Sequence, residues 1–166
     1  HHDDIMLGMM PHIIHLVREP TNKHIFTNMT SGFTSVTNSF LIEIIKKTID
    51  FIKRKRVRMI NYPDFFSNGY KLKRDKDVYH YLDRIADNDV NGQQRGLCHR
   101  VVRSYVEIFN IKSTKQLLAK LRLTIDELEK CYEGEKNSVS VQKLKGMIRE
   151  FEEELVWANY GVRVRD

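Results

Sequence analysis

Apolar residues recur every three or four positions through most of this chain, and this spacing restricts its fold to helices that each bury one face. The longest such stripe lies near the C-terminus and comprises Val141, Leu144, Ile148, Phe151 and Leu155. Side chains spaced in this way share one face of an α-helix, so the stripe has to pack against another element. The same spacing predicts helices over residues 39–52, 77–86 and 97–109.

Two capping signals predict a further pair of helices between residues 113 and 133. Ser113 with Gln116 marks the first start and Thr124 with Glu127 the second, because each pair can satisfy free amide groups of a first helical turn. The pair has the length of a helix-turn-helix. Its second helix carries four carboxylates and a single lysine, so we exclude DNA reading by it and expect a packing or protein-interaction role.

These patterns predict a mainly α protein, a single-domain helical bundle of about five to six helices, with an irregular N-terminal third and room for one short β element near residues 24–27. At 166 residues the chain is long enough for one domain with a real hydrophobic core. The expected divisions are 1–17, a tag remnant at His1 and His2 followed by an apolar segment; 18–38, an irregular loop region; 39–160, the helical bundle domain; and 161–166, a C-terminal tail.

Positive charge is concentrated in the middle of the chain. The net charge is +6, yet residues 40–76 carry eleven basic and four acidic side chains, whereas residues 112–160 carry nine of each. Five of the six residues from 53 to 58 are cationic. Such a cluster repels itself unless water or an anionic partner surrounds it, so a local excess points to a basic patch.

We interpret this patch as a surface for nucleic-acid phosphates, because lysine and arginine neutralise phosphates and release their counterions. The predicted contact residues are Lys53, Arg54, Lys55, Arg56 and Arg58, with Lys71, Lys73, Arg74, Arg100 and Arg103 as a second tier. Arg95, His99 and Arg103 share a helical face, which allows two basic faces to form one groove. No base-reading set is visible, so we expect weak sequence specificity for DNA or RNA. A solvated or protein-facing surface and a nuclear import signal remain alternative interpretations.

Two alternative functions stay open. The first is a non-catalytic protein-interaction or scaffold domain that uses the apolar N-terminus and the last helix, whose stripe ends in the aromatic residues Trp157 and Tyr160. The second is a degenerate EF-hand-like, calcium-responsive domain. Asp87, Asp89 and Asn91 stand at ligand positions of a calcium loop, but Cys98 replaces the bidentate glutamate, which favours a turn that caps the next helix.

Nothing in the sequence spells out a reaction. It contains no glycine-rich phosphate loop and no zinc-like ligand spacing, so we expect no catalytic residue, metal or cofactor.

We interpret Cys98 and Cys131 as small apolar residues of a protein in a reducing, intracellular compartment, cytoplasmic or nuclear. No apolar run approaches the ~20 residues of a membrane span. Richness in Ile, Asn, Lys and Asp suggests AT-rich coding, as in many viruses. We also expect the chain to be a piece of a larger replication, transcription or packaging protein.

Overall fold

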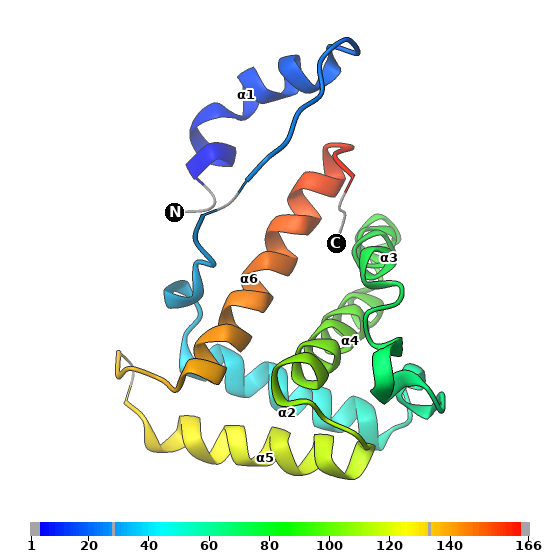
Figure 1. The fold of residues 1–166 in the computed structure, drawn as a ribbon, viewed down its shortest axis with the longest axis vertical. Helices are drawn as coiled ribbons and strands as arrows, with labels where there is room; N and C mark the ends of the chain where they lie inside the picture. Colours follow the sequence, from blue (N-terminus) through cyan, green and yellow to red (C-terminus); the bar gives the residue numbers. More distant parts are fainter. Residues whose placement is uncertain (1–3, 28, 133, 164–166) are drawn as a thin grey trace.

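The structure is a computed structural model that describes residues 4–27, 29–132 and 134–163. This part of the chain is mainly helical, which confirms the predicted fold class (Figure 1). The helices are α1 (Asp4–Arg18), α2 (Asn38–Lys53), α3 (Arg74–Ala86), α4 (Val90–Phe109), α5 (Thr114–Lys130) and α6 (Val139–Asn159), with the short turns η1 (Phe33–Ser35), η2 (Arg58–Asn61) and η3 (Phe65–Gly69). No strand forms within the described ranges, so the short β element allowed near residues 24–27 is absent there.

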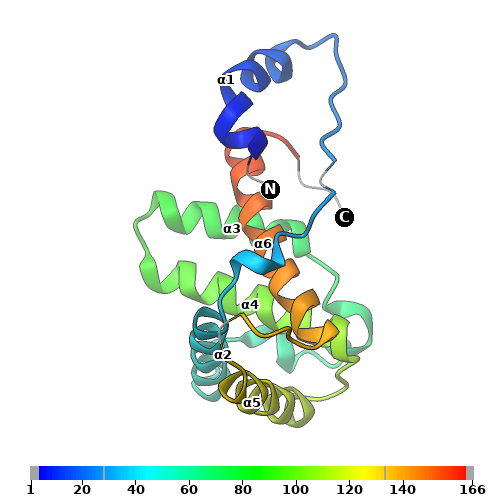
Figure 2. The same ribbon diagram turned by 90° about the vertical axis from the view of Figure 1, so that its left-hand side faces the viewer.

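Helix α4 is the centre of the bundle, and α2, α3, α5 and α6 pack around it (Figures 1 and 2). Every side chain from Arg100 to Val106 is buried. A helix covered on all sides has no solvent face for its polar residues. The arginines in this stretch therefore need partners inside the molecule, a point that matters for the candidate site.

Two apolar clusters hold the helices together. The larger one joins α2, α4, α5 and α6, and its fully buried members include Leu41, Ile45, Val101, Leu117, Leu121, Leu144 and Ile148. The smaller one lies between α3 and α6, where Val78 packs with Phe151 and Ala158. The ring of Phe151 also meets that of Tyr81 edge-on, with centroids 5.5 Å apart. The stripe predicted on the last helix thus faces both clusters.

Helix α2 begins one residue before the predicted range of 39–52. Thr37 is the N-cap, and its hydroxyl oxygen accepts a hydrogen bond from the amide of Phe40 at 3.1 Å. Asn38, the first residue of the helix, is buried and accepts a hydrogen bond from the Lys145 ammonium at 2.7 Å. This bond ties the first turn of α2 to α6, because each polar group satisfies the other away from water.

The predicted helix-turn-helix is wrong, since α5 runs without interruption from Thr114 to Lys130. Ser113 caps it as expected, and its hydroxyl accepts from the amide of Gln116 at 3.3 Å. Thr124, the second predicted cap, lies inside the helix, where its hydroxyl donates to the carbonyl of Lys120 at 3.0 Å. A threonine can make either bond, so the local pattern alone did not separate a cap from a mid-helix position.

Helix α1 stands apart from the other helices, near the end of the molecule where α6 finishes (Figures 1 and 2). It continues through Pro11, and its apolar residues Leu7 and Met9 are exposed. The expected tag remnant at residues 1 and 2 lies outside the described residues, as do residues 164–166 of the expected tail. No helix in the described part combines the length and apolar character needed to cross a membrane.

Candidate functional site

Most of the cationic run forms a tight loop after α2. We call residues 54–58 the basic loop. The amides of Lys55 and Arg56 donate to the carbonyls of Ile52 and Phe51, at 3.0 and 2.9 Å, which is the Schellman pattern of helix termination. Lys55 sits at the left-handed position of this motif, with φ of 56°. The fully buried Val57 then anchors the loop in the core.

A second Schellman turn delivers the start of α4 to the same region. At the end of α3, Asn88 adopts φ of 54°, and the amides of Asn88 and Asp89 bond back to Ile85 and Arg84. Asp89 then caps α4, accepting from the amide of Gly92 at 2.9 Å. A Cβ at Gly92 would lie 2.3 Å from the Asp89 carboxylate, so a larger residue there would displace the capping side chain.

This geometry confirms the capping interpretation of the Asx-rich segment. Because α4 begins at Val90, Asn91 and Gly92 belong to its first turn. A calcium loop needs these positions to wrap around an ion in extended form. The segment from residue 87 to residue 98 therefore does not form the ion-binding loop that its residue spacing suggested.

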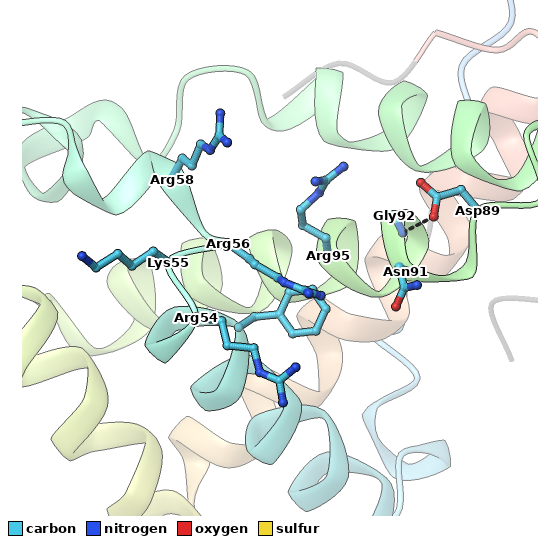
Figure 3. Close-up of a pocket in the computed structure, with 9 residues that line it drawn as sticks. Arg54, Lys55, Arg56, Arg58, Asp89, Asn91, Gly92 and Arg95 are labelled. Atoms are coloured by element: carbon cyan, nitrogen blue, oxygen red, sulfur yellow. Dashed lines mark hydrogen bonds between the residues drawn. The ribbon is translucent and has the colours of Figure 1, made fainter.

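The basic loop and the first turns of α4 enclose a hollow of about 280 Å³, which we call the basic pocket (Figure 3). Its lining residues are Phe51, Arg54, Lys55, Arg56, Arg58, Asp89, Asn91, Gly92 and Arg95. The Arg56 guanidinium lies over the Phe51 ring, 5.4 Å from its centroid. In Figure 3, Arg58 and Arg95 point to the same side, while Lys55 points away from Asn91 and Gly92. Five cations thus surround one hollow.

Most of these cations have no opposite charge beside them. Among the described residues, Lys55, Arg56, Arg58 and Arg95 form no ion pair. Arg54 pairs with Asp50 at 2.9 Å, a contact between exposed side chains that water weakens. The carboxylate of Asp89 lies 3.8 Å from Arg84 and also caps α4. The pocket therefore carries a strong excess of positive charge.

Lysines earlier in α2 are balanced instead. Lys46 contacts Glu129 of α5 at 3.0 Å, and Lys47 contacts Glu43 at 2.7 Å. Lys53, which we had placed in the contact set, is exposed but is not among the residues that line the pocket. The unpaired cations that line the pocket are thus Lys55, Arg56 and Arg58 of the loop, together with Arg95 of α4.

The second-tier residues are divided between surface and interior. Lys71 and Lys73 are exposed between η3 and α3 and do not line the pocket. Arg100 and Arg103 are buried, with 1% and 7% of their surfaces exposed, which corrects their assignment to a phosphate-binding surface. Arg74 is half-buried and contacts Glu107 and Glu150, at 3.3 and 3.7 Å. These three arginines serve the fold.

We call their ion pairs the buried arginine network; its members are Arg74, Asp77, Arg100, Arg103, Glu107, Glu150 and Glu154. Arg103 donates to both carboxylate oxygens of Asp77 and to the carbonyls of Tyr70 and Leu72. This fork of bonds fixes the chain that enters α3 against α4, because a guanidinium offers several donors in one plane.

Arg100 links α4 to α6. It donates to the Glu154 carboxylate and to the carbonyl of Arg74, and it lies over the Phe151 ring at 4.6 Å. Burial lowers the pKa of Arg100 and raises the pKa of Glu154, while each partner's charge opposes the shift of the other. Burial also raises the pKa of Glu150. The Arg100–Glu154 and Arg103–Asp77 pairs thus hold charge where water is scarce, which makes each residue dependent on its partner.

The contact set proposed from sequence lacked Asn91 and Gly92, and it did not rank Arg95 among the phosphate contacts. Arg95 had been placed on a basic face with His99 and Arg103, but only Arg95 reaches the basic pocket. Two Schellman turns, at the ends of α2 and α3, bring the basic loop and the start of α4 together at the pocket. Recognising both turns in the sequence would have identified these residues. Left-handed positions occupied by lysine and asparagine are weak signals in a sequence.

The chain matches no protein-family model, no curated protein and no solved structure. A function for the basic pocket therefore has to follow from its own charge and shape.

Proposed function

We propose that this chain binds nucleic acid by holding backbone phosphates in and around the basic pocket. The observation that carries the proposal is the gathering of Arg54, Lys55, Arg56, Arg58 and Arg95 around one hollow. Four of them lack an ion-pair partner among the described residues. Crowded cations of this kind gain free energy when phosphate replaces small counterions.

The lining also supports weak sequence specificity. Reading bases needs side chains that fit into a groove and present matched donors and acceptors. Here the cations spread in several directions, and the one aromatic side chain among the described lining residues, Phe51, is buried beneath Arg56. Such a surface suits contacts with phosphates, which position a protein without reading sequence.

We propose that the domain belongs to a larger protein of replication, transcription or packaging, and that this protein acts inside the cell. Cys98 and Cys131 are both free cysteines, and Cys98 is buried. A reducing compartment keeps such thiols from forming disulfides. A viral parent is part of the same proposal, on the grounds of composition alone.

The direct test is fluorescence anisotropy with short single- and double-stranded DNA and RNA at two salt concentrations. We expect binding that weakens steeply with salt, since each phosphate contact adds about 0.7 to 0.9 to the slope of log affinity against log salt. Absence of binding at low salt would overturn the proposal and make the basic loop a solvated or protein-facing surface.

A double variant locates the binding on the pocket. Replacing Arg56 and Arg58 together with glutamine should reduce the salt slope by about 1.4 to 1.8, the share of two phosphates. The matched control is Lys115→Gln with Arg122→Gln, which removes the same charge from exposed positions of α5 without described ion pairs. An equal loss of slope in both double variants would mean that only total charge matters.

Exposed apolar residues favour a second candidate function, a protein-interaction role for α1. Leu7 is 80% exposed and Met9 and Leu16 lie on the same helix with large exposed areas. Several exposed apolar side chains on a helix outside the bundle are typical of a contact surface. Sedimentation of the chain in 1 M salt tests self-association, and Leu7→Ser with Leu16→Ser should abolish any complex found there.

A further inference from the structure

We propose that the basic pocket preferentially holds a terminal phosphate, the phosphomonoester at the end of a nucleic-acid strand. This inference rests on the proposed nucleic-acid binding and narrows it to the chemical group that the pocket itself takes. Phosphodiesters of the adjoining strand would then lie along the exposed cations outside the hollow.

The shape of the site supports an end-binding role. The basic loop forms one wall, the first turns of α4 form the other, and the buried Phe51 lies beneath the Arg56 guanidinium. A phosphate in the middle of a strand carries chain on both sides, so entering a hollow requires the strand to bend sharply. A terminal phosphate carries chain on one side only and can enter directly.

The charge of the site favours the same group. A phosphomonoester carries about −1.5 to −2 near pH 7, because its second pKa is about 6, whereas a phosphodiester carries a single negative charge. Lys55, Arg56, Arg58 and Arg95 bring four cations without described ion pairs to the hollow. The additional charge of a phosphomonoester therefore increases its attraction to the cations around the hollow.

The size and lining of the hollow argue against a base as the bound group. A volume of about 280 Å³ takes a phosphate with its water, and most of its described lining side chains are charged or polar. Stacking of bases needs an accessible aromatic face. The Phe51 ring is 6% exposed and covered by Arg56, so it does not offer one.

The test compares three oligonucleotides of one sequence, with a 5′-phosphate, a 3′-phosphate or hydroxyl groups at both ends, in anisotropy titrations at pH 7.5. We expect about five- to tenfold tighter binding of a phosphorylated end. The preference should shrink at pH 5.5, where the monoester takes up its second proton. Arg95→Gln should remove the preference and Arg122→Gln should leave it, with melting temperatures of both variants measured to confirm that they fold.

The outcomes separate this inference from the function on which it rests. Equal, salt-dependent binding of all three strands would keep the proposed function and overturn the preference for an end. No binding of any strand would overturn both. A nucleoside monophosphate that binds as tightly as the phosphorylated strand would overturn the assignment to a strand end and make the ligand a free nucleotide.

Discussion

The basic pocket and the buried arginine network use the same side chain in opposite ways. In the network, Arg103 and Arg100 are buried and face Asp77 and Glu154. In the pocket, the cations reach solvent, and four of them have no carboxylate partner among the described residues. An arginine that is buried and paired holds elements of the fold together, whereas a cluster of exposed, unpaired cations keeps its charge available for an outside anion.

The difference has a simple physical origin in the elements that carry these residues. Helix α4 is covered on all sides along its second half, so arginines there meet the acidic residues of α3 and α6. The basic loop leaves the bundle at the end of α2, where Asp50 pairs with Arg54 and the Asp89 carboxylate caps α4. Position in the bundle, and not residue type, decides the role.

The largest expected effect comes from breaking the network. Arg103→Met leaves the carboxylate of Asp77 and two backbone carbonyls without their donor, and an uncompensated buried charge costs about 3–5 kcal/mol. Urea unfolding measures the loss in the free energy of unfolding. The double variant Arg103→Met with Asp77→Leu should recover part of it, because both charges are then gone. A loss below about 1 kcal/mol in the single variant would show that the network does not stabilise the fold.

Placing a carboxylate in the pocket should make it resemble the network. Asn91→Asp keeps the shape of the side chain and adds a negative charge to the lining, so nucleic-acid affinity should fall about fivefold, or about 1 kcal/mol. In the first turn of α4 the same charge should stabilise the helix by about 0.3–1 kcal/mol. Fluorescence anisotropy measures the expected loss of affinity, and thermal melting measures the expected gain of stability. Asn22→Asp, outside the pocket, is the control that should leave affinity nearly unchanged.

Two lysines at left-handed positions separate the effect of charge from that of backbone conformation. Lys55 and Lys73 have φ of 56° and 65°, and only Lys55 lines the pocket. Glycine adopts this conformation without the clash of a side chain, so each Lys→Gly variant should gain roughly 0.5–1 kcal/mol of stability. Lys55→Gly should also bind nucleic acid more weakly. Equal affinities of the two variants would exclude Lys55 from the binding surface.

The smallest expected effect concerns His99, a partly buried residue of α4. Burial lowers the pKa of His99, with Arg103, Arg95 and His80 acting in the same direction and Asp77 against it. The unfolded chain then holds this proton more tightly than the folded one. Stability should therefore fall as pH drops below about 6.5, the ordinary pKa of histidine.

Urea unfolding at pH 7.5 and 5.5 tests this dependence in the parent chain and in His99→Gln. Burial raises the pKa of Glu150 and Glu154, which contributes with the opposite sign, since that stability is lost as pH rises. The difference between the two proteins isolates the histidine. An identical pH dependence in both would contradict the assignment.

Much of the fold was predictable because apolar periodicity reports directly on buried helix faces. The stripe of α6, the faces of α2 and α4 and the cap at Ser113 all follow from neighbours close in sequence. The single α5 was missed because Thr124 makes the bond of a mid-helix threonine to Lys120. A local sequence pattern separates a helix cap from a mid-helix threonine only when one of the two hydrogen bonds is excluded.

The candidate site was less predictable, because its composition depends on contacts between distant segments. Asp77 is 26 residues from Arg103, and Glu154 is 54 residues from Arg100. Nothing local distinguishes these arginines from Arg95, which shares their helix and reaches the pocket. The basic run itself stands out in the sequence, whereas its neighbours in space do not.

The stacking of Phe26 on Trp157 gives the molecule an internal fluorescent probe. The two rings lie 4.3 Å apart, and Trp157 is the single tryptophan of the chain. The contact joins residues 19–27, which follow α1, to the far end of α6. The indole nitrogen of Trp157 also donates to Glu153 at 3.1 Å. The emission wavelength of this one residue should therefore report whether residues 19–27 lie against the end of α6.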